Sequence, residues 1–145
     1  MATSFNTIID RALIVVNDYK LLKLINQSRD DFNTWCDSFL VSAVPNFTNC
    51  RQKLDYDLDK REFEADLTNM EISILADLWV IVWWEKETNV ASRINALLQT
   101  NNSVKTHSAS QNLKEKDARI SSLYTKLHQK MENDYELQYL DELDI

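Results

Sequence analysis

The sequence predicts an all-α fold, a small bundle of about five helices with a long C-terminal helix and an acidic tail. Three observations predict it. The chain contains no glycine, and Pro45 is its single proline, whereas strand-rich folds need glycine at tight turns and bulges. Apolar residues recur at steps of three and four along most of the chain. Residues that cap helices stand before several of these runs.

The composition is that of one globular domain. A chain of 145 residues can bury one real core but not two, and 44% hydrophobic with 27% charged residues is typical of a folded protein. We expect a single helical domain over residues 1–131 and an acidic tail over residues 132–145. The net charge of −7 disfavours tight binding to nucleic-acid phosphates, and the lack of glycine excludes phosphate-cradling loops and nucleophile elbows.

The first third of the chain predicts three helices. Ser4 can cap the first, because an apolar stripe follows it at helical spacing. A second apolar patch over residues 21–25 predicts one or two further helical turns. Ser28 can cap a third helix with Asp30 and Asp31 in its first turn, where the helix dipole favours acids, and Pro45 ends that helix. The stripe of the first helix consists of Phe5, Ile8, Ile9, Leu13 and Val16.

Residues 51–66 are acidic and contain few large apolar side chains. We expect a solvated, partly mobile connection there, and its length suggests that it has a function of its own. An EF-hand-like start at Asp55 and Asp57 is interrupted by Lys60, so we do not expect calcium binding. Among the acids of this segment are Asp55, Asp57, Asp59, Glu62 and Glu64.

Thr68 and Glu71 form a capping box, which predicts the start of the strongest helix of the chain. Residues 70–84 are apolar on nearly every side, as in a helix that is buried all round. The run from Trp79 to Trp84 also suits a strand, but no partner strand is evident, so we favour a helix. Trp84, at its end, is the tryptophan that we expect at an interface.

The remaining sequence predicts two more helices. Thr88 or Asn89 can cap a short helix over residues 90–98, residues 99–108 should form a polar loop, and a long helix should run from Ser110 to Tyr135. Five basic residues of that helix are interleaved with acids, which favours a solvated face over a nucleic-acid surface. They are Lys114, Lys116, Arg119, Lys126 and Lys130.

The sequence shows no pattern of residues that is typical of a catalytic or metal-binding site. His107 and His128 lack the spacing of a zinc site, and Cys36 and Cys50 form no CxxC pair, so we expect reduced thiols in or near the core. We therefore predict no enzyme and no cofactor.

The longest apolar run, residues 78–84, is too short to cross a bilayer, and no basic, apolar leader begins the chain. We expect synthesis in a cytoplasm and no membrane partner.

The order of several motifs resembles the small α-helical head-to-tail connector (neck or adaptor) proteins of tailed bacteriophages. The resemblance covers the chain from Phe5 to Tyr139, and the helix from Asn112 and the Asp-Leu-Thr segment contribute most to it. In chain order the motifs are Ala43-Val44-Pro45-x-Phe47-x-x-Cys50, Asp66-Leu67-Thr68-x-x-Glu71-Ile72-x-Ile74-Leu75, Val82-x-Trp84, Asn89, Lys105-x-His107-Ser108-x-Ser110-x-Asn112-Leu113-Lys114 and Asp134-Tyr135-x-x-x-Tyr139.

The resemblance implies a structural virion protein at the head–tail junction. Such proteins form rings, commonly of about twelve copies, beneath the portal protein. The ring extends the channel through which DNA passes without specific binding, and it offers a docking surface for another neck or tail-completion protein. We expect the acids Asp55, Asp57, Asp59, Glu62 and Glu64 to face that channel. The resemblance also implies that the C-terminal region reaches the portal. Together with Trp84, the expected partner-docking residues are then Tyr135, Leu137, Tyr139, Leu140 and Leu143.

Two other readings remain open from the sequence. The first is a small cytosolic helical module or regulator that binds a partner helix. The second is an enzyme with an unrecognised site, which would need a pocket with convergent polar groups.

Overall fold

A computed structural model describes the backbone of residues 2–16, 19–99 and 103–136, and the side chains of residues 2–16, 22–89 and 114–136. Helices make up 75% of the described residues, so the all-α prediction is confirmed. The five α-helices are α1 (Phe5–Val15), α2 (Tyr19–Gln27), α3 (Arg29–Ala43), α4 (Asn69–Gln99) and α5 (Ser103–Gln129). A 3₁₀ turn, η1 (Val44–Asn46), follows α3, and a π-helical stretch, η2 (Lys130–Tyr135), continues α5.

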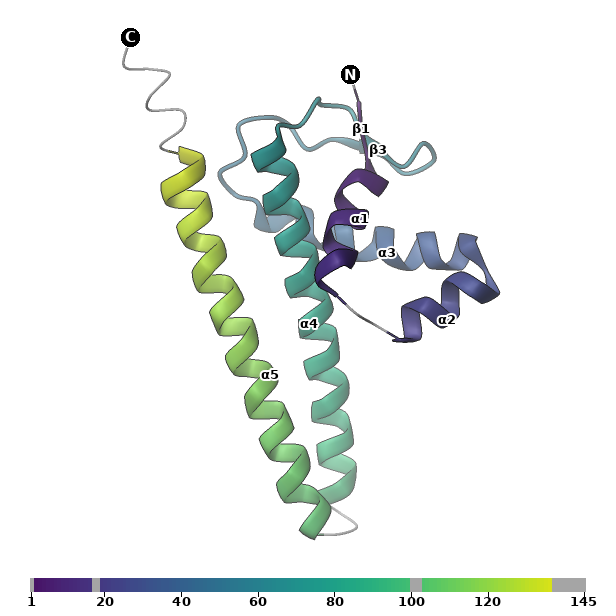
Figure 1. Cartoon of the computed structure of the whole chain (residues 1–145), viewed down its shortest axis with the longest axis vertical. Coiled ribbons are helices and arrows are strands. Elements are labelled where there is room, and N and C mark those ends of the chain that lie inside the picture. Colours follow the sequence, from purple (N-terminus) through teal and green to yellow (C-terminus); the bar gives the residue numbers. More distant parts are fainter. Residues whose placement is uncertain (1, 17–18, 100–102, 137–145) are drawn as a thin grey trace.

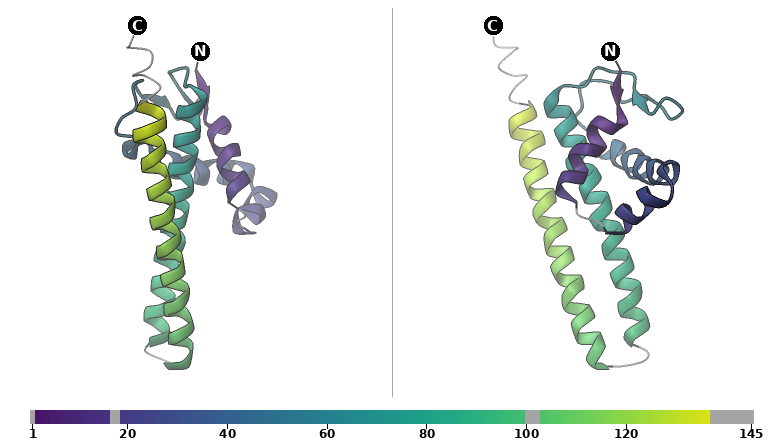
Figure 2. Two further views of the ribbon diagram at one scale, coloured as in Figure 1. Left: turned by 60° about the vertical axis from the view of Figure 1, so that its left-hand side comes forward. Right: turned by 45° about the vertical axis from the view of Figure 1, so that its right-hand side comes forward.

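The long helices α4 and α5 form an antiparallel pair that runs the length of the molecule (Figure 1). Helices α1 and α3 pack on the first half of α4, and α2 packs on α3. The distal half of the α4–α5 pair extends beyond these shorter helices, as both views of Figure 2 show. The N-terminal strand and the end of η2 lie at the opposite, broader end of the molecule.

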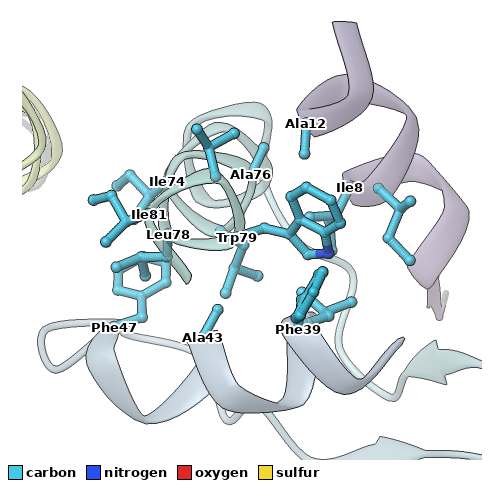
Figure 3. Packing of buried hydrophobic residues seen from close by; sticks show 14 of the residues in the cluster. Ile8, Ala12, Phe39, Ala43, Phe47, Ile74, Ala76, Leu78, Trp79 and Ile81 are labelled. Carbon is cyan, nitrogen blue, oxygen red and sulfur yellow. The ribbon is translucent and has the colours of Figure 1, made fainter. Parts of the chain in front are cut away.

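Trp79 of α4 lies at the centre of the hydrophobic core. Its side chain is fully buried between α1 and α3 (Figure 3). The indole ring packs edge-on against Phe39, with 5.3 Å between ring centroids, and its Nε1 donates a 3.0 Å hydrogen bond to the Cys36 carbonyl. A buried Trp N–H needs such a partner, so this bond fixes the orientation of the ring and joins α4 to α3.

The predicted helix starts are present. The Ser4 and Ser28 hydroxyls accept hydrogen bonds from the Asn6 and Asp31 backbone N–H groups, at 3.2 and 3.3 Å. The capping box of α4 is complete. The Glu71 N–H donates to the Thr68 hydroxyl at 3.2 Å, and the Thr68 N–H donates to the Glu71 carboxylate at 2.8 Å.

The predicted break near Thr88 is wrong, because α4 continues without interruption to Gln99. The Thr88 hydroxyl does not cap a new helix; it donates back to the Trp84 carbonyl at 2.9 Å, within the same helix. The predicted loop over residues 99–108 is also too long, since α5 begins at Ser103. Pairing of α4 with α5 along their length outweighs the weak capping signals of threonine and asparagine in this region.

Residues 51–66, which we expected to form a solvated, partly mobile connection, contain two short strands of a small sheet. Strand β2 (Tyr56–Asp57) pairs with β3 (Glu62–Phe63), and β3 pairs with β1 (Thr3–Ser4), all antiparallel. The Asp57 carboxylate replaces glycine as the turn-forming element by accepting the Asp59 and Lys60 N–H groups, at 2.9 and 3.2 Å. Arg61 takes up the left-handed conformation that the turn requires, with φ of 54°.

Phe63 holds this hairpin on the body of the protein. Its side chain is fully buried and packs against Phe5 at a centroid distance of 5.1 Å. Arg61 adds a two-bond ion pair to α3, because its Nε and Nη2 donate to the two Asp37 carboxylate oxygens at 2.7 and 2.8 Å.

Candidate assembly surfaces

Large apolar side chains are exposed on several separate elements. On α1, Ile14 and Val15 are 86% and 60% exposed, and Leu22 of α2 and Leu58 of the hairpin turn are 54% and 56% exposed. Singly exposed apolar residues are normal on a protein surface, whereas a contiguous exposed apolar patch marks an interaction site.

A groove lies between α1, α4 and α5. Its volume is about 230 Å³, room for an aliphatic side chain. Three charged residues rim it: Asp77, Lys126 and Lys130. We call it the α1–α4–α5 groove, and its apolar lining consists of Val15, Val80, Ile81, Leu123 and Leu127.

A second, more open depression of about 540 Å³ lies on α2 and α3, with Leu24, Trp35 and Phe39 on its walls. The Lys86 ammonium lies 4.2 Å from the centroid of the Trp35 ring, a cation–π contact. Trp84, the tryptophan that we expected at an interface, is half-buried. Its ring packs edge-on against Trp83, with 5.0 Å between ring centroids. Because the side chain is only half-buried, part of its surface is accessible in the single chain.

The five acids predicted to face a channel lie on or beside the β2–β3 hairpin. Asp55, Asp59 and Glu64 are exposed, whereas Asp57 and Glu62 are half-buried. Asp57 has a structural task, since its carboxylate closes the turn. The surface is less acidic than the five positions suggest, because the basic residues Arg51, Lys53, Lys60 and Arg61 are interspersed among the acids of this segment.

Tyr135 does not have the exposed position that a docking residue needs. Its side chain is 1% exposed, and its ring packs edge-on against Phe47 at 5.5 Å. The hydroxyl donates to the Glu71 carboxylate at 2.7 Å and accepts the Arg51 N–H at 3.0 Å. Tyr135 therefore anchors the end of η2 to the start of α4. The other predicted docking residues, Leu137, Tyr139, Leu140 and Leu143, lie outside the described residues.

Glu71 is the centre of this network. Although its side chain is fully buried, its two oxygens accept four hydrogen bonds, from the Thr68 N–H, the Gln52 amide, the Tyr135 hydroxyl and the Cys50 thiol. Burial alone raises the pKa of Glu71, but these hydrogen bonds outweigh it and hold the pKa below its ordinary value. The carboxylate is thus a charged structural group that joins three segments.

The thiols are free, as expected from the sequence. Cys36 is buried, which raises its pKa to about 12, and burial together with the neighbouring Glu71 raises the pKa of Cys50 to about 11. Both thiols are therefore protonated and weakly nucleophilic at neutral pH. His128 is exposed and lies 3.9 Å from Glu132, and the side chain of His107 is outside the described set. In the described part of the chain, no three His, Cys, Asp or Glu residues cluster as metal ligands would.

Of the five basic residues predicted on the last helix, Lys130 is the one whose described side-chain contacts reach α4. Its ammonium donates to the Ser73 hydroxyl and, at 2.9 Å, to Asp77. Lys114, Arg119 and Lys126 are exposed and Lys116 is half-buried.

Within the described ranges, no helix combines the length and the apolar character that crossing a membrane requires. Comparison of the chain with protein-family models, with curated proteins and with solved structures yields no match.

Proposed function

We propose that this chain is a structural subunit that assembles with copies of itself and with other proteins, and specifically a head-to-tail connector of a tailed-phage virion. The observation that carries the proposal is the exposure of large apolar side chains on different elements, Ile14 on α1, Leu22 on α2 and Leu58 on the hairpin. Exposed apolar side chains on separate elements suit a subunit with more than one neighbour, as in a ring.

The rest of the molecule is consistent with a building block. The described residues are bound into one body by buried contacts, among them the Tyr135–Glu71 bond and the Arg61–Asp37 pair. A connector subunit needs such rigidity because it transmits no chemistry and only holds its neighbours in register. The motif order set out above supplies the specific assignment to the neck, with the portal protein above the ring and a neck or tail-completion protein below it.

Purification of the tagged chain from infected cells tests this proposal. The cells carry the phage that encodes the chain, and the co-purified proteins are identified by mass spectrometry. We expect the portal protein or another neck protein to co-purify in amounts comparable to the tagged chain. Recovery of host regulators alone, with no virion protein, would contradict the proposal.

The second candidate function is a helix-binding regulator, and the open depression on α2 and α3 favours it. Its apolar walls, Leu24, Trp35 and Phe39, are of the kind that accept one face of an amphipathic helix. A regulator of this kind would form a small complex of fixed size and would be absent from purified virions.

A further inference from the structure

The α1–α4–α5 groove has an apolar floor and a basic rim. Val80, Ile81 and Leu127 form its floor, and the exposed Val15 forms one edge. On the rim, Asp77 already pairs with Lys130, whereas Lys126 makes no ion pair with any side chain that the structure describes. The groove therefore fits an apolar segment that carries negative charge.

Residues 137–145 have that chemistry. Leu137, Leu140 and Leu143 stand three residues apart, and Asp141, Glu142 and Asp144 are interleaved with them. The segment holds no lysine or arginine. We propose that residues 137–145 of one copy dock in the α1–α4–α5 groove of a neighbouring copy, with a leucine side chain on the apolar floor and a carboxylate facing Lys126.

The direction of α5 favours a neighbour over the same chain. From Leu123 and Leu127, α5 and its continuation η2 run on to Glu136, away from the groove. To return to its own groove, the chain would have to reverse its direction after Glu136. A neighbouring copy can present its groove without that requirement.

This contact deepens the proposed function, since it rests on self-assembly. Each copy offers one tail and one groove, which are different surfaces. Contacts between different surfaces are head-to-tail and continue until the ring closes. Under this inference the tail joins subunit to subunit, in contrast to the portal contact that the family resemblance implies.

Disulfide trapping in the full-length protein tests the inference. One chain carries Val15→Cys, and a second carries Leu137→Cys, Leu140→Cys or Leu143→Cys. The two are mixed at high concentration and oxidised, and the mixed dimer is measured on a non-reducing gel. Cys36 and Cys50 contribute little background, because their pKa values of about 12 and about 11 keep them protonated.

Ile14→Cys is the matched control, because Ile14 is the more exposed neighbour of Val15 yet does not line the groove. We expect roughly tenfold more mixed dimer with Val15→Cys than with Ile14→Cys for at least one tail position, since a disulfide forms only across short Cα distances. Equal yields would overturn the inference. A single chain that carries both cysteines gives the second outcome. If its disulfide forms only within the chain and never between chains, the inference is also overturned.

A charge variant tests the ionic part. Lys126→Glu should lower the yield of mixed dimer several-fold, whereas Lys114→Glu, on the exposed surface of the same helix and outside the groove, should not. An unchanged yield with Lys126→Glu would contradict the assigned docking mode. These measurements use neither the portal protein nor virions. Their outcome is therefore independent of the co-purification test: the tail contact can be absent from a true virion protein, and it can be present in a protein that is not part of a virion.

Discussion

The Tyr135 hydroxyl donates a 2.7 Å hydrogen bond to the buried carboxylate of Glu71, 64 positions earlier in the chain. The same hydroxyl accepts the Arg51 N–H at 3.0 Å. One phenol group thus joins the end of η2, the start of α4 and the segment that leads to the β2–β3 hairpin. Because η2, which continues α5, ends in this contact, the hydrogen bond helps to hold the last helix to the body of the protein.

Tyr135→Phe should lower the free energy of unfolding by about 1–3 kcal/mol, because the ring still packs on Phe47 while a buried carboxylate loses a donor. Urea unfolding followed by tryptophan fluorescence measures the change. Tyr124→Phe is the control, since the Tyr124 hydroxyl donates to Glu85 at the surface at 2.7 Å. A loss for Tyr124→Phe as large as that for Tyr135→Phe would refute the role given to Tyr135.

Glu71→Gln should destabilise the protein at neutral pH and remove part of its acid sensitivity. The pKa of Glu71 is lowered in the folded state, so the carboxylate contributes stability above the ordinary glutamate pKa of 4.5, and this contribution is lost as the pH falls through the lowered value. Unfolding midpoints measured from neutral pH downward should fall below pH 4.5 more steeply for the wild type than for Glu71→Gln. An equally steep fall of the unfolding midpoint with pH in the wild type and in Glu71→Gln would contradict this account of Glu71.

The Arg61–Asp37 pair should show strong energetic coupling. Both side chains are mostly buried, at 23% and 13% exposure, and the geometry provides two charge-assisted bonds. A double-mutant cycle with Asp37→Asn and Arg61→Gln should give a coupling energy of about 1.5–3 kcal/mol. The same cycle on the exposed His128 and Glu132 should give at most about 0.5 kcal/mol. Coupling no larger than in this surface pair would mean that the hairpin is held by its aromatic packing alone.

Neutralising the exposed acids of the hairpin tests whether they face the DNA channel. Asp55→Asn, Asp59→Asn and Glu64→Gln together should leave the melting temperature nearly unchanged, because these side chains are exposed. In virions the same triple variant should slow DNA ejection, because loss of repulsion lets phosphates adhere to the wall. Asp57→Ala is the contrasting variant and should weaken the fold itself, since it removes the acceptor that closes the turn. Normal ejection kinetics for the triple variant would disprove the channel hypothesis.

The helical part of the fold was accessible from local signals. Ser4, Ser28 and the Thr68–Glu71 box each mark a helix start that the structure contains. Such caps are encoded within four residues, so they need no tertiary information. The end of α4 was missed because a threonine within a helix can bond back to the preceding turn, as Thr88 does to Trp84.

The pairing of β1 with β3 and the Tyr135 contact join residues far apart in the chain, so the sequence predicted them poorly. Strands of two residues show too little alternation to detect, and Asp57 forms the turn where glycine would be the usual signal. The aromatic residues Tyr56 and Phe63, which face each other across the hairpin, were the available sign. Tyr135 was assigned to docking, whereas the structure buries it on Glu71, which lies close only in the folded chain.

The central claim is that this chain is a repeated structural part of a virion neck. Quantitative mass spectrometry of purified virions, calibrated against the portal protein, measures its copy number directly. The account predicts that the chain is present in every preparation at a ring-like stoichiometry, about twelve copies per particle. Absence of the chain from purified virions, while it is abundant in infected cells, would contradict the account.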